Sequence, residues 1–323
     1  MKILVTGSNG HLGEALMRAL AKDVHHSARG LDLWPSPYTE AVGSITDREF
    51  VREALRGVDA VAHTATLHKP HVATHSQQAF VDTNITGTLI LLEEALTQGI
   101  ERFVFTSTTS TFGGSLAPRP GEPAAWITED VPCIPKNIYG ATKTAAEDLC
   151  WLFHRRDGLS VVVLRTSRFF PEEDDSKAAR EAYDDANLKA NEFLYRRVDI
   201  EDAVSAHVQA LDRSSAIGFG RYIISATTPF SKNEAAALRS DGPAVVARHA
   251  PDYVAEYARR GWRMLPSFDR VYVNQRARNE LGWEPRYDFG YILKQLRDNE
   301  PMGSSLSRVV GIKGYQGPAN PRD

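Results

Sequence analysis

Apolar and polar positions along the first half of the chain follow a repeating strand-and-helix pattern. Residues 2–6 are an apolar run typical of a fully buried strand, and residues 11–21 place their apolar side chains on one face of a helix. The same alternation predicts a strand ending near residue 32, a helix over 47–56, a strand over 60–63, a helix ending near 98, a strand over 102–107, a helix over 137–156 and a strand over 160–165. Repeated βα units predict a doubly wound parallel sheet, a Rossmann α/β fold, covered by helices on both faces.

The pattern changes after residue 165. An acidic stretch containing Phe and Pro is followed by predicted helices over 180–195 and 201–211 and a strand over 221–225. We therefore expect a dinucleotide-binding domain and a smaller substrate-binding region that is split in the sequence. The first comprises residues 1–165 with about 197–225, and the second comprises 166–196 and 226–300. Residues 301–323 are rich in Gly, Ser and Pro and lack a helical or strand period, which predicts a tail or a partner-docked extension.

Composition and charge exclude several classes of protein. Of the 323 residues, 42% are hydrophobic and 24% are charged, which suits a sizeable core rather than disorder. Because 38 Lys and Arg nearly balance 41 Asp and Glu, no basic field attracts nucleic acid or a membrane surface. Cys133 and Cys150 form no CxxC pair, so a disulfide framework and a structural zinc site are not expected. With no signal-peptide core and no apolar run long enough to span a bilayer, we expect a cytoplasmic protein.

A glycine loop, TGSNGHLG, lies between the first strand and the first helix. Gly7 would make the tight turn, Gly10 would let the backbone approach a pyrophosphate, and Gly13 would let helix and sheet pack closely. The helix N-terminus adds unpaired N–H groups and partial positive charge. The residues expected to bind a dinucleotide here are Gly7, Asn9, Gly10, His11, Leu12 and Gly13. A glycine-containing structural turn is the alternative.

Asp32 lies 19 residues beyond Gly13, at the predicted end of the second strand. A carboxylate there hydrogen-bonds the adenosine ribose and repels a 2′-phosphate, which favours NAD over NADP. NADP remains an alternative cofactor, because the Arg29 side chain could contact a 2′-phosphate if the strand ended earlier.

Tyr139 and Lys143, in YGATK, are spaced i to i+4 and so share one face of a helix. A phenol with a pKa near 10 is a poor base at neutral pH. We expect Lys143 and the positive charge of an oxidised nicotinamide to lower the pKa of Tyr139, so that it can exchange a proton with an alcohol or ketone. An exposed helix face could carry the same pair, but the upstream glycine loop favours catalysis.

Polar side chains gather where two other predicted strands end. Hydroxyls follow the strand over 102–107, and one of them is expected to polarise a substrate oxygen. His68 and Lys69 follow the strand over 60–63 and should border the substrate pocket. His63 is predicted to be a core residue. His71 and His75 have the spacing of a helical metal pair, but without an HExxH glutamate or a third ligand no metal site is expected.

Taken together, these motifs resemble the extended short-chain dehydrogenases/reductases of the NAD-dependent epimerase/dehydratase family over about residues 1–300. The motifs are the glycine loop, Asp32, AHTA (62–65), NITGT (84–88), FVFTSTTSTFG (103–113), YGATK (139–143) and RRVDIEDAVSA (196–206). The resemblance implies that Thr108, Tyr139 and Lys143 are catalytic. It further implies that Tyr139 and Lys143 also bind the cofactor, with Lys143 holding the nicotinamide ribose. Thr64 and Ala65 would line the cofactor, and Asn84 would touch it or order the site. Ser44 and Ile45 would hold the adenine-contact position, and two long helices would form a homodimer.

The chain also departs from that family. Only 31 residues separate Arg165 from Arg197, so the glycine-rich hairpin usual in nucleotide-sugar enzymes is missing, and Arg168 stands where those enzymes carry Asn. A shortened region suits a compact substrate, and Arg168 with Thr109 would contact it. We therefore expect an NAD-dependent oxidoreductase acting on a sugar, sugar acid or similar polyol. The alternatives are a nucleotide-sugar 4-epimerase that retains NAD and an NAD-sensing protein without catalysis.

Overall fold

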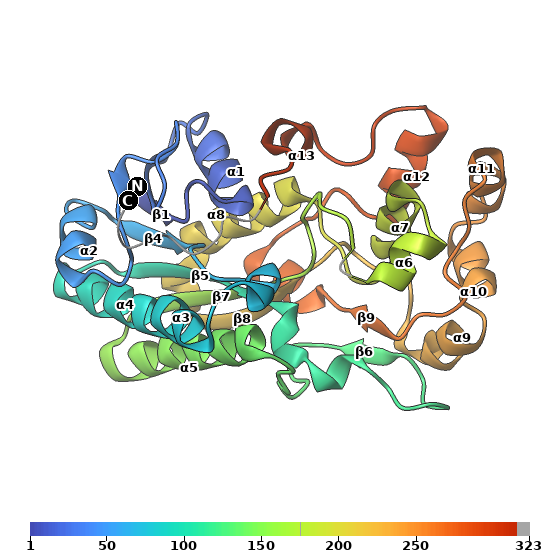
Figure 1. Ribbon diagram of the computed structural model, residues 1–323, viewed down its shortest axis with the longest axis horizontal. Coiled ribbons are helices and arrows are strands. Elements are labelled where there is room, and N and C mark those ends of the chain that lie inside the picture. The colour runs from blue at the N-terminus through green and yellow to red at the C-terminus, as the bar shows by residue number, and fades with distance from the viewer. Residues whose placement is uncertain (175, 315–323) are drawn as a thin grey trace.

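The computed structural model describes residues 1–174 and 176–314, and its centre is a seven-stranded sheet of order β3-β2-β1-β4-β5-β7-β8. Every neighbouring pair of strands is parallel, which confirms the predicted doubly wound fold (Figure 1). The strands are β1 Lys2–Thr6, β2 Ser27–Asp32, β3 Ala41–Val42, β4 Ala60–His63, β5 Arg102–Thr108, β7 Ser160–Thr166 and β8 Phe219–Ile224.

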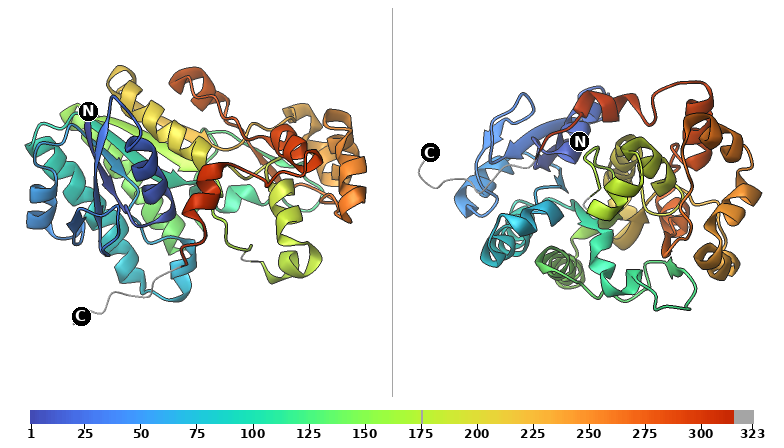
Figure 2. Two further views of the ribbon diagram at one scale, coloured as in Figure 1. Left: turned by 90° about the horizontal axis from the view of Figure 1, so that it is seen from above. Right: turned by 45° about the vertical axis from the view of Figure 1, so that its right-hand side comes forward.

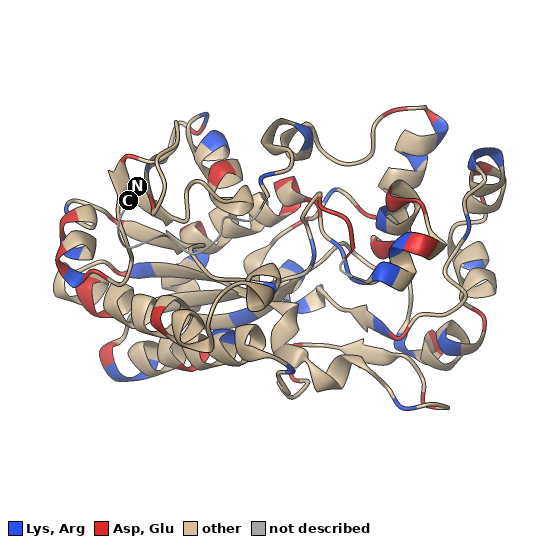
Figure 3. Ribbon diagram, in the orientation of Figure 1, with Lys and Arg blue, Asp and Glu red and all other residues tan. Residues whose placement is uncertain are grey.

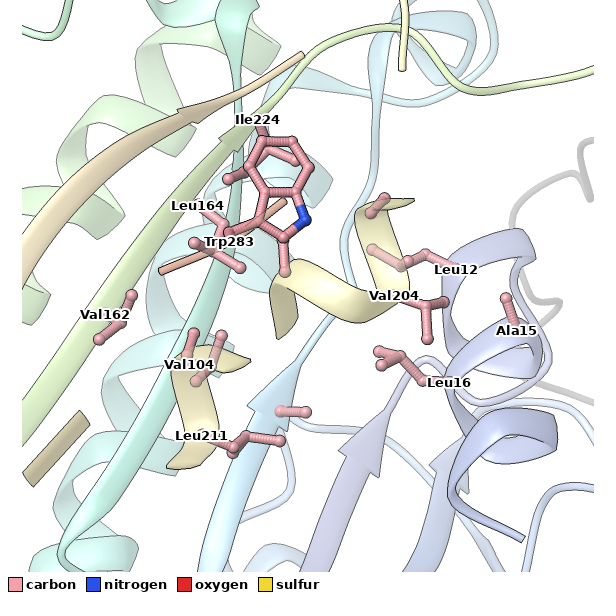
Figure 4. Packing of buried hydrophobic residues seen from close by; sticks show 14 of the residues in the cluster. Leu12, Ala15, Leu16, Val104, Val162, Leu164, Val204, Leu211, Ile224 and Trp283 are labelled. Carbon is pink, nitrogen blue, oxygen red and sulfur yellow. The ribbon is translucent and has the colours of Figure 1, made fainter. Parts of the chain in front are cut away.

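Helices cover both faces of this sheet. One face packs on α1 His11–Leu20 and α8 Ile200–Ile217, and the other packs on α2 Arg48–Ala54, α4 Gly87–Thr97 and α5 Ile138–Asp157. Alternate residues of each strand are buried in the two cores, because successive side chains of a strand point to opposite faces of the sheet. In the first core the Trp283 ring lies beside Leu164 and Ile224 (Figure 4). Its Nε1 donates to the carbonyl oxygen of Asp202 at 3.1 Å.

The second predicted region, 166–196 and 226–300, packs around a separate hydrophobic core that also includes Ala124 and Trp126, which the prediction places in the first domain. We call the elements around this core the substrate-side region. The substrate-side region lies at one end of the molecule (Figure 2). Basic and acidic residues are interspersed over both this region and the sheet-containing part of the chain (Figure 3). The elements of the substrate-side region are α6 Lys177–Ala182, α7 Asp185–Glu192, α9 Ala235–Ser240, α10 Gly242–His249, α11 Tyr253–Arg260, α12 Phe289–Arg297 and the parallel strand pair β6 Ala125–Ile127 and β9 Arg270–Tyr272. Among the described helices, none is long and apolar enough to cross a membrane.

Two predicted elements were wrong. The helix predicted over 180–195 is two helices, α6 and α7, because Tyr183 between them is extended at φ −139° and ψ 143°. Part of the predicted tail is helical: α13 Ser305–Val310 begins after a Ser304 cap and places Val310 in the core beneath α1 and α8. Such a short helix is stabilised by its tertiary contacts and shows no period in the sequence. Residues 315–323 of the predicted tail lie outside the described residues.

Candidate functional site

A cleft of about 800 Å³ lies at the carboxyl ends of the sheet strands, between the glycine loop and the substrate-side region. This is where open α/β sheets bind ligands. Asn84 and Lys143 are not among the residues that line it. The other predicted site residues line it: Gly7, Asn9, Gly10, His11, Leu12, Gly13, Asp32, Ser44, Ile45, Thr64, Ala65, His68, Lys69, Thr108, Thr109, Tyr139 and Arg168.

The glycine loop has the close backbone contacts that a dinucleotide cradle requires. Gly7 has φ +74°, and a Cβ on it would lie 2.8 Å from the backbone of Ala65. A Cβ on Gly13 would lie 1.9 Å from the carbonyl oxygen of Gly7. At the start of α1, Gly10 provides no side-chain cap, so the first-turn N–H groups remain available to an anion. The loop therefore fits the pyrophosphate of a dinucleotide.

Asp32 ends β2 on the wall of the cleft. Its carboxylate accepts the N–H of Asn9 and the N–H of Trp34, each at 3.0 Å. Burial raises the pKa of Asp32, and these hydrogen bonds oppose that rise. Arg29 lies outside the cleft, where its Nε donates to Glu40 Oε1 at 3.0 Å and its Nη1 to the carbonyl of Ala54. Asp32 therefore provides the carboxylate expected for a ribose, whereas Arg29 is not placed to meet a 2′-phosphate.

Tyr139 and Thr108 meet at the floor of the cleft. Tyr139 lies in the first turn of α5, which begins where the Asn137 side chain accepts the N–H of Gly140 at 3.0 Å. Thr108 ends β5, and its hydroxyl accepts the N–H of Ser110 at 3.1 Å and hydrogen-bonds to Tyr139. A strand end and a helix start thus bring a hydroxyl and a phenol together.

In the protein without its cofactor, Lys143 does not lower the pKa of Tyr139. The predicted lowering includes the positive charge of a bound nicotinamide, so it stays a prediction. Burial raises the pKa of Tyr139 to about 12, and only the hydrogen bond with Thr108 opposes this rise. Burial also lowers the pKa of Lys143 to about 7. Lys143 Nζ lies 3.9 Å from the centre of the Phe105 ring. Desolvation therefore favours the neutral, protonated form of the Tyr139 phenol and disfavours the charged form of the Lys143 amine.

A buried carboxylate behind this pair was missed in the sequence. Glu147 is 1% exposed and lies one turn beyond Lys143 on α5. It accepts the Ser107 hydroxyl at 2.5 Å, and its second oxygen lies 2.7 Å from Arg165 Nη2. The i+4 spacing from Lys143 was the available signal, but Arg165 and Ser107 reach this carboxylate only through the fold. Its charge raises the pKa of Lys143, against the larger effect of burial.

Two other buried polar residues order the surroundings of the site. The Asn84 side chain accepts from Thr66 Oγ1 at 2.9 Å and donates to Thr142 Oγ1 at 3.0 Å, so it ties the loop after β4 to α5. His63 is 1% exposed and contacts the hydroxyls of Thr6 and Thr88. The prediction that His63 is a core residue is confirmed.

At the substrate end of the cleft, His68 and Arg168 line the cleft as predicted, but both also contact neighbouring parts of the protein. The ring of His68 stacks on Phe170, with centroids 5.2 Å apart. Arg168 lines the cleft, but its Nη2 donates to the carbonyls of Glu172 at 3.0 Å and Glu173 at 2.7 Å, which hold the guanidinium against a loop. Further lining residues were missed: Arg196, Arg270 and Tyr272, because the folding of the substrate-side region could not be placed, and Lys136, in the loop before α5. Among residues 1–174 and 176–314, no group of three or more His, Cys, Asp or Glu side chains is placed to hold a metal ion.

Comparisons with known proteins agree with this architecture. The model of the NAD dependent epimerase/dehydratase family matches residues 3–224. The dTDP-glucose 4,6-dehydratase of Streptomyces niveus is 32% identical over 191 residues, 53% of this chain and 55% of that protein. The UDP-glucose 4-epimerase of Streptomyces lividans is 31% identical over 159 residues, 46% of each chain.

The fold also matches solved structures along nearly its whole length. A short-chain dehydrogenase/reductase superfamily protein from Agrobacterium tumefaciens, crystallised with bound NAD, aligns with a TM-score of 0.66 at 24% identity. The alignment covers 93% of this chain and 98% of that one. By contrast, the sequence matches span 39% to 55% of the length of the first three curated relatives.

Proposed function

The chain belongs to the NAD dependent epimerase/dehydratase family, and on this premise we propose that it is an NAD-dependent oxidoreductase acting at a secondary alcohol or ketone. The observation that carries the proposal is that Thr108 and Tyr139 line the same cleft as the glycine loop. A proton-exchanging phenol beside a dinucleotide cradle is the arrangement that carbonyl–alcohol interconversion needs.

Each side chain has a separate role in this proposal. The glycine loop and Asp32 would hold the dinucleotide, which would accept hydride as NAD in alcohol oxidation and donate it as NADH in ketone reduction. The Thr108 hydroxyl donates a hydrogen bond to the substrate oxygen and stabilises the negative charge that develops there. Tyr139 gives a proton to that oxygen during ketone reduction and removes it during alcohol oxidation. Without cofactor, burial raises the pKa of Tyr139 to about 12, so the ligand-free protein holds the phenol in its protonated form.

The substrate we propose is a compact sugar, sugar acid or polyol. The chain between β7 and α8 is short, which leaves little material to enclose a nucleotide diphosphate. Cationic side chains at the substrate end of the cleft suit a carboxylate or phosphate on the substrate; they are Lys69, Lys136, Arg168, Arg196 and Arg270. A nucleotide-sugar 4-epimerase is the second candidate, since a matched relative carries the name UDP-glucose 4-epimerase.

The test is to incubate the purified protein with NAD and a panel of sugars and sugar acids and to follow NADH absorbance. Net NADH formation supports a dehydrogenase, and an isomerised product without net NADH supports an epimerase. Tight calorimetric binding of UDP-sugars, with none of simple sugars or sugar acids, would overturn the compact substrate. Binding of NAD without turnover of any substrate would favour the NAD sensor.

We further propose that the protein is a homodimer that uses the outer face of α5. This face exposes Trp151 by 41% and Leu152 by 45%, and contact between two copies would remove that apolar surface from water. Light scattering should give twice the 35.8 kDa chain mass for the wild type and the chain mass for the double variant Trp151→Glu, Leu152→Glu. Val254→Glu, at an exposed position on α11, should remain dimeric. A monomeric wild type would overturn the dimer.

A further inference from the structure

The C-terminal chain passes over the glycine loop after α13. We name residues 311–314 the strap. Its base is anchored: α13 packs against α1 and α8 (Figure 1), Val310 is buried with Leu12 and Leu16, and the N–H of Ser304 donates to Asp199 Oδ2 at 2.9 Å. The strap therefore leaves a fixed point beside the start of α1.

Lys313 connects the strap to the first turn of α1. Its backbone N–H donates to His11 Nε2 at 3.2 Å, and its ammonium pairs with the carboxylate of Glu14. Lys313 and Gly314 both line the cleft beside the glycine loop. The Lys313 side chain is 22% exposed, so its ammonium is largely enclosed, and the residue borders the space that a ligand would occupy.

The charges around this point are predominantly negative. Glu14 lies in the first turn of α1 and is 6% exposed, Asp32 lines the same cleft, and Glu172 Oε1 lies 3.0 Å from His11 Nε2. Carboxylates here would repel a diphosphate placed at the N-terminus of α1. Two cations offset the negative charge of Glu14. Arg18, outside the cleft, has its Nε 2.7 Å from Glu14 Oε1, whereas Lys313 pairs with Glu14 from the cleft side.

We propose that Lys313 is a cofactor-binding residue whose ammonium pairs with the pyrophosphate of the dinucleotide. The inference rests on the proposed function, because it presupposes a dinucleotide on the glycine loop. In the ligand-free chain Glu14 holds the ammonium beside this loop. When the diphosphate binds, the ammonium contacts phosphate oxygens and continues to offset Glu14. The strap thus adds a cation to a cradle otherwise made of backbone N–H groups.

The test compares two ligands that differ in the diphosphate. ADP-ribose retains the pyrophosphate of NAD, whereas adenosine lacks it. Calorimetry should show that Lys313→Met weakens binding of NAD and ADP-ribose about tenfold, the loss typical of one charge-assisted hydrogen bond, and leaves adenosine binding unchanged. Lys313→Arg should restore most of the affinity. Lys294→Met, at an exposed position on α12, is the matched control and should bind like the wild type.

Three outcomes would overturn the inference. Unchanged ADP-ribose affinity in Lys313→Met would show that the ammonium does not reach the diphosphate. Equal losses for adenosine and ADP-ribose would show a general disturbance of the cleft. A loss confined to NADP would assign Lys313 to a 2′-phosphate instead. If the wild type bound neither NAD nor ADP-ribose, the proposed function itself would fail, so the two failures are distinguishable.

Discussion

Replacing Tyr139 with Phe is expected to lower kcat about 10³-fold while changing the Kd for NAD less than about threefold. The phenylalanine ring keeps the apolar contacts of a side chain that is 8% exposed, so only the proton-exchanging oxygen and its hydrogen bond with Thr108 are lost. The rate is measured by NADH absorbance with the best substrate from the panel, and NAD affinity by calorimetry.

Tyr253→Phe is the matched control for this variant. Tyr253 is also buried, but its hydroxyl donates to the carbonyl of Pro243 in the substrate-side region. Its removal should leave kcat unchanged within about twofold and cost about 1 kcal/mol of stability. Full activity of Tyr139→Phe would remove the phenol from the mechanism.

Replacing Lys143 with Met is expected to lower kcat about 10²-fold and, at the same time, to stabilise the protein at pH 6 by about 1–3 kcal/mol. The ammonium is buried at 2% exposure beside the Phe105 ring, and its desolvation is costly. Methionine has a similar length and no charge, so it fills the same space without that cost. Activity is expected to fall because we propose that Lys143 holds the nicotinamide ribose and, together with the positive charge of the bound cofactor, lowers the pKa of Tyr139.

The stabilisation should depend on pH with a defined sign. Burial lowers the pKa of Lys143 from 10.5 to about 7, so between these values the unfolded chain binds more protons than the folded protein. Wild-type stability therefore gains from this group as pH rises through that window, and the advantage of Lys143→Met shrinks. Thermal unfolding at pH 6 and pH 9 measures the difference. Lys294→Met should show none, and a lower Tm for Lys143→Met at pH 6 would contradict the argument.

Parts of the fold with a strong local pattern were predictable from the sequence. The predicted strands 2–6 and 60–63 coincide with β1 and β4, because a buried parallel strand is an uninterrupted apolar run bounded by turn residues. The glycine loop was recognised from its spacing between strand and helix. The same reasoning failed at α13, where a few residues become helical only because Val310 finds a pocket between α1 and α8.

In the candidate site, too, features set by local backbone geometry were predictable from the sequence, and features set by tertiary contacts were not. The chain's periodicity and spacing were enough to place Tyr139 one turn from Lys143 on a helix and Asp32 at the end of a strand, since these relations depend on local backbone geometry. The protonation of the phenol, the pairing of Glu147 with Arg165 and the arrival of Lys313 beside Glu14 required the folded chain. Desolvation and Coulomb interaction depend on distance and burial in space, and residues far apart in sequence set both.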